Sequence, residues 1–151
     1  MTEPFGLAAS IFATIQIADT IITYCKYLIE TTRDAPSDVY VIHAEVSATK
    51  SFFDRWRSMS QANNDLYERL KSLDEEVGPI KGCHRVMRDL GKLIKADDAN
   101  ILVGAQSGRE RFKKSLAVLK WPLKAGQATK LLQQLNGYKT SISMAMATES
   151  T

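Results

Sequence analysis

Apolar residues recur at every third or fourth position along most of this chain, which is the spacing of one face of an α-helix. The longest such stretch covers residues 4–29, where two adjacent apolar rows start at Leu7 and Ala8. Before Gln16 the remaining positions are almost all apolar as well, whereas after it they are polar. A helix that is apolar on every side is enclosed by protein or by lipid. The pattern therefore predicts a helix over about residues 4–32 that either protein or lipid encloses, and in the resting monomer we expect it to be the central helix of a bundle.

Further rows predict helices along the rest of the chain. One spans about residues 38–59, and the side chains of Asn63 and Asn64 are suited to cap a short helix that follows it. Residues 96–108 are predicted to form a loop, and a basic helix comes after it. The connections between most of these segments are short, so consecutive helices are expected to lie side by side in opposite directions.

Two proline positions mark the starts of the other long helices. Gly78 and Pro79 precede one, and Pro122 opens the last, where a proline fits the first turn. The expected inner faces of the three long helices after the first are, in chain order, Val39, Ile42, Val46, Thr49, Phe53 and Trp56; Ile80, Cys83, Met87, Leu90 and Ile94; and Ala128, Leu131, Leu135, Tyr138, Ile142 and Ala145. The fold class is therefore predicted as all-α, an antiparallel helical bundle of about four main helices plus one or two short ones. It forms one domain over residues 1–148, with a polar tail at 149–151.

Charge is distributed unevenly. Residues 1–106 carry 12 Lys and Arg against 15 Asp and Glu, whereas residues 107–148 carry eight basic residues against one acidic residue. A basic segment of this kind contacts anionic lipid, nucleic acid or an acidic partner, or it is a solvated helix face. The candidates for contact with lipid headgroups or a partner are Arg109, Arg111, Lys113, Lys114, Lys120 and Lys124.

Catalytic and metal-binding patterns are missing from the sequence. Cys25 and Cys83 fall in apolar rows, so they are expected to be buried thiols. His43 and His84 are expected to be packed or surface imidazoles, and neither has a neighbour with metal-ligand spacing. We therefore expect a protein that is not an enzyme and that uses no metal and no cofactor.

The N-terminal stretch lacks the features of a secretory signal or of a permanent membrane span. Its only charge before the apolar run is Glu3, whereas a signal peptide begins with basic residues. The uncharged run of residues 4–18 is shorter than the roughly 20 residues that a bilayer requires, and Asp19 then interrupts it. The resting protein is expected to be soluble and cytoplasmic.

Several stretches of the chain resemble the HeLo and HeLo-like domains of fungi. The opening Met-Thr-Glu-Pro-Phe-Gly, followed by an apolar helix, is similar to the start of HeLo domains. Residues 119–124 (Leu-Lys-Trp-Pro-Leu-Lys), 130–135 and 138–143 resemble the C-terminal part of HeLo-like domains. The likeness covers nearly the whole chain, and the Trp-Pro junction with its leucine row is the most specific part.

The resemblance implies a cell-death execution domain of the kind found at the N-terminus of fungal NOD-like receptors. Such domains stay inactive until a receptor or an amyloid-type signal clusters them, and they then oligomerise and permeabilise the plasma membrane from its inner face. The partners implied are further copies of the chain, an anionic phospholipid membrane and the upstream receptor or amyloid partner. The residues expected to enter the membrane are Glu3, Phe5, Leu7, Ile11, Phe12 and Ile15.

A soluble oligomerisation or adaptor module that does not touch lipid is the alternative interpretation. Nucleic-acid binding is not expected, since the basic segment has no recognisable motif and few interleaved aromatic residues. Binding to anionic vesicles distinguishes the membrane-permeabilising domain from the soluble module.

Overall fold

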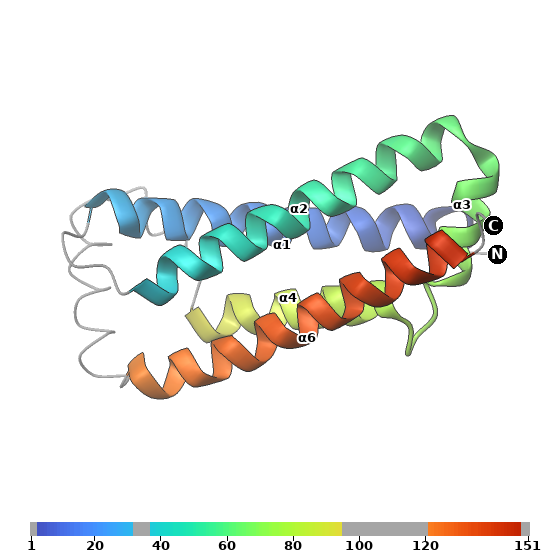
Figure 1. The fold of residues 1–151 in the computed structure, drawn as a ribbon. Coiled ribbons are helices and arrows are strands. Elements are labelled where there is room, and N and C mark those ends of the chain that lie inside the picture. Colours follow the sequence, from blue (N-terminus) through green and yellow to red (C-terminus); the bar gives the residue numbers. More distant parts are fainter. Residues whose placement is uncertain (1–2, 32–36, 95–120, 149–151) are drawn as a thin grey trace.

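A computed structural model describes residues 3–31, 37–94 and 121–148 of the 151-residue chain. These residues form five helices and no strand (Figure 1), so the all-α prediction is confirmed for this part of the chain. The helices are α1 (Glu3–Thr31), α2 (Ser37–Ala62), α3 (Asn64–Ser72), α4 (Pro79–Ile94) and α6 (Trp121–Thr148). The predicted loop at 96–108 and the basic helix after it lie outside the described residues.

The local signals in the sequence explain where these helices begin. The side-chain oxygen of Asn63 accepts hydrogen bonds from the backbone N–H groups of Asp65 and Leu66, at 3.0 and 3.3 Å, and so caps α3. Gly78 precedes α4, and a Cβ at this position would lie 2.6 Å from the backbone oxygen of Leu73, so only glycine fits there. Pro122 lies in the first turn of α6, where an amide hydrogen is not needed.

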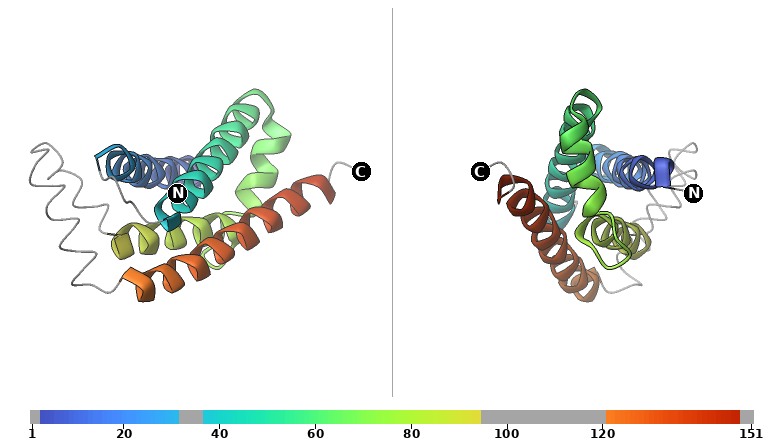
Figure 2. Two further views of the ribbon diagram at one scale, coloured as in Figure 1. Left: turned by 60° about the vertical axis from the view of Figure 1, so that its left-hand side comes forward. Right: turned by 90° about the vertical axis from the view of Figure 1, so that its right-hand side faces the viewer.

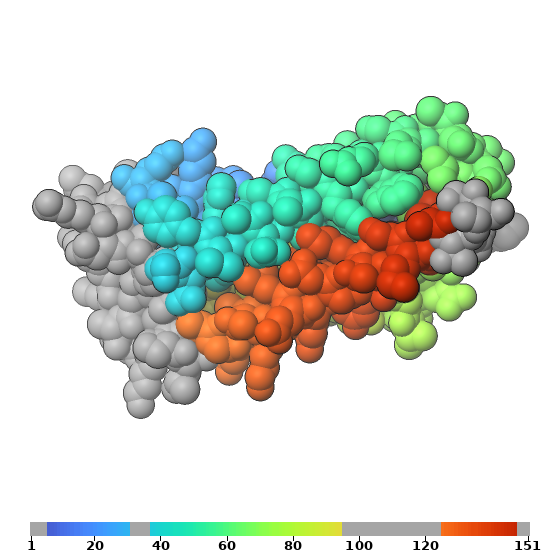
Figure 3. All heavy atoms as spheres, in the orientation of Figure 1, coloured from blue at the N-terminus to red at the C-terminus, as the bar shows by residue number. Residues whose placement is uncertain are grey.

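The four long helices form a ring in which each helix contacts two others. α1 packs on α2 and on α4, and α6 packs extensively on α4 and more lightly on α2. Figure 2 shows α3 at one end of the ring, where it contacts both α2 and α6. On the face shown in Figure 3, α2 and α6 lie next to each other. α1 therefore occupies a corner of the ring, and the prediction that it is the central helix is wrong.

Consecutive long helices run in opposite directions (Figure 1), so α1 and α2 are antiparallel, as are α4 and α6. The other two contacting pairs, α1 with α4 and α2 with α6, run in the same direction. The reason is that α3 carries the chain across the end of the ring before α4 begins. A short α1–α2 connection does produce an antiparallel neighbour, but the sequence did not show that α4 would pack beside α1.

The predicted inner faces form the core. All of the predicted inner residues of α4 are buried, as are those of α2 except the half-buried Trp56. In α6 the predicted row alternates between buried and half-buried residues, and two residues outside it, Leu132 and Met146, are also buried. The expected three-and-four spacing therefore identified most of the core. In α6 the buried face is rotated slightly about the helix axis from the predicted row, towards Leu132 and Met146.

Candidate functional site

The inner side of α1 is part of the hydrophobic core. Among the residues predicted to enter a membrane, Leu7, Ile11 and Ile15 are buried, with between 2% and 7% of their surface exposed. The buried side continues through four more residues, which are Ala18, Ile21, Cys25 and Leu28. Since α1 packs on α2 and α4, these side chains can meet lipid only if α1 leaves its place in the ring.

The outer side of α1 is exposed, contrary to the expectation of a fully enclosed helix. Ala8 and Ala9 are exposed, and Phe12 has 52% of its surface exposed. A corner helix has neighbours on two sides only, which leaves its outer side to solvent. Glu3 and Phe5 belong to α1, but their side chains lie outside the described part of the chain.

α1 is also the one described helix that is long and apolar enough to cross a membrane, over Gly6–Glu30, with a mean hydropathy of 1.4. This segment is longer than the uncharged run because it includes Asp19, Lys26 and Glu30. One third of its most apolar window is buried inside the fold. A core helix of a soluble protein meets the same criterion, so the contacts of α1 decide what it can do.

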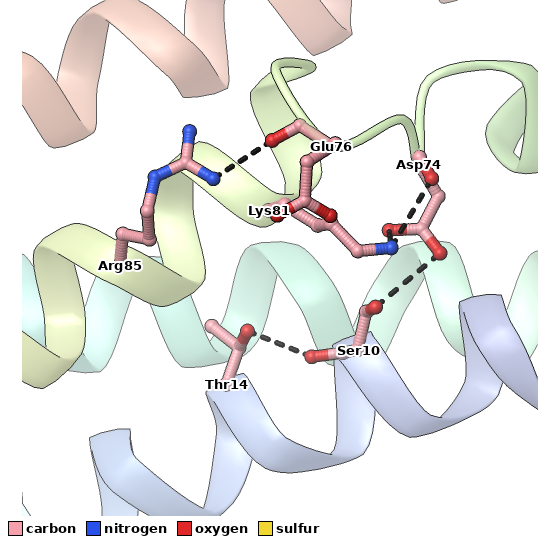
Figure 4. Close-up of polar contacts among 6 residues, drawn as sticks. All are labelled: Ser10, Thr14, Asp74, Glu76, Lys81 and Arg85. Atoms are coloured by element: carbon pink, nitrogen blue, oxygen red, sulfur yellow. Dashed lines mark hydrogen bonds and ion pairs between the residues drawn. The ribbon is translucent and has the colours of Figure 1, made fainter.

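A buried carboxylate fastens the N-terminal half of α1 to the rest of the ring (Figure 4). Ser10 Oγ donates a hydrogen bond to Asp74 Oδ2 at 3.3 Å, and Lys81 Nζ of α4 lies 3.4 Å from Asp74 Oδ1. The Asp74 side chain is only 5% exposed and lies in the connection between α3 and α4. A buried charge is costly unless it is paired, so the carboxylate binds both partners in the docked arrangement. Ser10 also accepts from Thr14 Oγ1 through its backbone oxygen, at 2.8 Å.

A second polar contact joins α1 to α2. Lys50 Nζ of α2 lies 2.6 Å from Asp19 Oδ1, and both side chains are partly exposed. The hydrogen bond to Asp19 and its negative charge raise the pKa of Lys50. This ion pair neutralises the charge that interrupts the apolar stretch of α1 while the helix is docked.

Burial shifts the pKa values of the two thiols and of the half-buried imidazole of His84. Burial raises the pKa of Cys25 and of Cys83 to about 12, so both stay protonated and unreactive near neutral pH. Burial, with the nearby charges of Arg88, Arg85 and Lys81, lowers the pKa of His84. The described residues contain no group of His, Cys, Asp and Glu side chains that could hold a metal ion.

Most of the residues predicted to contact lipid headgroups fall outside the described residues. Arg109, Arg111, Lys113, Lys114 and Lys120 are in the 95–120 segment, and Lys124 belongs to α6 with its side chain outside the described part.

The structure brings forward another basic set that the charge count did not reveal, on the outer side of α4. It consists of Lys81, Arg85, Arg88 and Lys92. Their spacing of four, three and four is visible in the sequence, but the net negative sum of residues 1–106 concealed it.

Comparison of this chain with protein-family models, with curated proteins and with solved structures finds no match. The function is therefore argued from α1, from the contacts that hold it and from the charges around it.

Proposed function

We propose that this chain is a membrane-targeting, pore-forming cell-death execution domain of the HeLo-like type. Clustering activates it, and the apolar N-terminal helix, about residues 4–29, inserts into the plasma membrane. The observation that carries the proposal is the position of α1, the most apolar long helix, at a corner of the ring with its outer side exposed. A helix at a corner can leave without passing through the rest of the fold.

The burial of α1 explains why release requires a trigger. Exposing its inner row to water costs roughly 1.5–3 kcal/mol for each large apolar side chain, so the monomer in solution keeps α1 docked. Hydrocarbon or the helices of neighbouring copies would shelter the same surface. The other three long helices then hold α1 in the bundle while the protein is cytoplasmic, and they release it at the inner face of the plasma membrane.

The charges on α1 indicate that several copies act together. A charged side chain at the centre of a bilayer costs about 2.5–3.5 kcal/mol, and an inserted α1 would carry Glu3 and Asp19 without the Lys50 partner. A ring of helices can turn these carboxylates towards a water-filled lumen. The partners of the active state are therefore further copies of the chain and anionic phospholipid, with an upstream NOD-like receptor or amyloid-type partner supplying the clustering signal.

Dye leakage from anionic vesicles tests the proposal, with the domain clustered by a fused oligomeriser. We expect Phe12→Glu to reduce leakage at least tenfold, because it places a charge costing about 2.5–3.5 kcal/mol on the outer side of α1. Tyr40→Glu is the matched control, since Tyr40 on α2 is exposed to 51% and Phe12 to 52%. Equal leakage from the two variants would show that α1 does not enter the bilayer.

The alternative is a soluble oligomerisation or adaptor module of an immune receptor, and the burial of the inner row of α1 favours it. A module of that kind keeps α1 docked when it clusters. It would then self-associate normally but release no dye from vesicles, in the native form and in both variants.

A further inference from the structure

The outer side of α4 carries a continuous row of positive charge. Lys81, Arg85, Arg88 and Lys92 follow one another at helical spacing, and Asp89 is the one acidic residue of this helix. Residues three and four apart lie on the same side of a helix, so the four cations share one face. Lys81 and Lys92 are 11 positions apart, which corresponds to roughly 17 Å along the helix axis.

The cations at the two ends of this row differ in their contacts. Lys81 lies beside the carboxylate of Asp74, and Arg85 Nη1 donates a hydrogen bond to the backbone oxygen of Glu76 at 2.8 Å (Figure 4). Arg88 and Lys92 are exposed, and no ion pair occupies either of them among the described residues. The part of the row further from the α3–α4 connection is therefore available to an anionic partner.

A groove extends this row from α4 to α6. It is open to solvent and has a volume of about 540 Å³. Its lining includes Lys92 and Leu93 from α4 and Lys130 and Leu131 from α6, together with Gln127 and Gln134. The lysines are exposed and the leucines are half-buried, so cations border an apolar floor. α6 contains no acidic residue, and only Asp89 among the lining residues is acidic.

We propose that Arg88, Lys92 and Lys130 form the surface through which the domain first contacts an anionic phospholipid membrane. This inference rests on the proposed function and names the surface that would recognise the membrane. Cations bordering an apolar floor complement a phospholipid, in which an anionic headgroup adjoins a hydrocarbon chain. The groove has no aromatic lining residue on which nucleic-acid bases would stack.

Part of this surface belongs to α4, which is also a packing neighbour of α1. α4 packs against α1, so a membrane that meets the outer side of α4 lies close to the helix proposed to insert. Binding through α4 and α6 leaves the contacts of α1 unchanged. Membrane recruitment and release of α1 are therefore separate steps that can be measured separately.

Sedimentation with phosphatidylserine-containing vesicles, using the unclustered protein, tests the surface. Each cation near an anionic membrane contributes about 1 kcal/mol, so the triple variant Arg88→Gln, Lys92→Gln and Lys130→Gln should bind about 100-fold more weakly. The matched control is Arg55→Gln, Arg57→Gln and Lys71→Gln, on α2 and α3, which lowers the net charge of +3 by the same amount. We expect the control to lose less than about fivefold, because these cations lie on other surfaces.

Equal losses in the two triple variants would overturn the inference, since net charge alone would then explain binding. Unchanged binding in both would overturn it as well, as would native protein that binds poly-glutamate or RNA but not vesicles. Leakage after clustering is measured independently of this binding assay. If the sedimentation result contradicts the surface but the clustered protein still releases dye in an α1-dependent way, only the proposed surface is refuted. If the protein binds vesicles through this surface but never releases dye, only the proposed function is refuted.

Discussion

α4 contacts both α6 and α1, and the two contacts differ in how tightly the helices interlock. A Cβ on Gly82 would lie 2.5 Å from the ring carbon Cζ of Tyr138, so the Tyr138 ring of α6 keeps its position against α4 only because this residue is glycine. A Cβ on Gly91 would lie 3.8 Å from Ile21 of α1, which is an ordinary van der Waals separation. At these two glycines, α4 therefore approaches α6 too closely to admit a side chain, whereas it leaves room for one beside α1.

The charges on α1 and α2 also differ from those on α4 and α6. On α1 and α2 both signs are present and several charges are paired, as in Asp19 with Lys50 and Asp54 with Arg57. On α4 and α6 positive charges dominate, and Asp89 is their one acidic residue. This contrast indicates a basic platform of α4 and α6, from which α1 can detach when its polar contacts are released.

The largest effect is expected from removing the buried carboxylate of Asp74, which fastens α1 to the rest of the ring. Asp74→Ala removes the acceptor of the half-buried Ser10 hydroxyl and the partner of Lys81, whose side chain is 33% exposed. A hydrogen bond to a charged group contributes about 1.5–3 kcal/mol, so we expect the free energy of unfolding to fall by about 1–3 kcal/mol, with looser docking of α1. Labelling of the buried Cys25 thiol by a maleimide, followed by mass spectrometry, should accelerate at least tenfold.

Asp54→Ala is the control for this prediction, because Asp54 belongs to a partly exposed ion pair on α2 alone. Its removal should change the unfolding free energy by less than about 1 kcal/mol and leave Cys25 labelling unchanged. Cys25 labelling that stays slow in Asp74→Ala would show that this carboxylate does not fasten α1.

Substituting the two glycines of α4 compares the α4–α6 contact, at Gly82, with the α4–α1 contact, at Gly91. Gly82→Ala forces the Tyr138 ring to move and should destabilise the fold by about 1–2 kcal/mol, within the range for overpacking. Gly91→Ala meets only ordinary contacts and gains helix propensity, so it should stabilise the fold by about 0.5–1 kcal/mol. Urea unfolding of both variants measures the difference. Equal changes of the same sign in the free energy of unfolding would show that α4 packs equally closely on α6 and on α1 at these two positions.

The sequence predicted the helices better than it predicted their neighbours. Helical spacing identified the buried row of α4, and Asn63 was placed correctly as the cap of α3. Periodicity shows which side of a helix is apolar but not how many helices cover it, so α1 was expected at the centre rather than at a corner. Nor could it show that Ser10 would meet Asp74, which lies 64 residues away and depends on where the α3–α4 connection turns.

The smallest effect is expected at the ion pair that joins α1 to α2. Both side chains are partly exposed, and such pairs contribute little and weaken with salt. Asp19 raises the pKa of Lys50 above its ordinary value of 10.5 in the folded protein. The stabilisation is therefore fully present below that value and is lost as pH rises through the higher pKa of the folded state.

Lys50→Gln tests this sign. The native protein should be slightly more stable than the variant near about pH 8, and the difference should disappear once the pH exceeds the raised pKa of Lys50. Cys25 and Cys83 also titrate at high pH, but both proteins contain them, so their contributions cancel in the comparison. Lys26→Gln, on the exposed side of α1, should show no such pH-dependent difference. A difference for Lys50→Gln that grows with pH would mean that Asp19 is not the partner that holds α1 to α2.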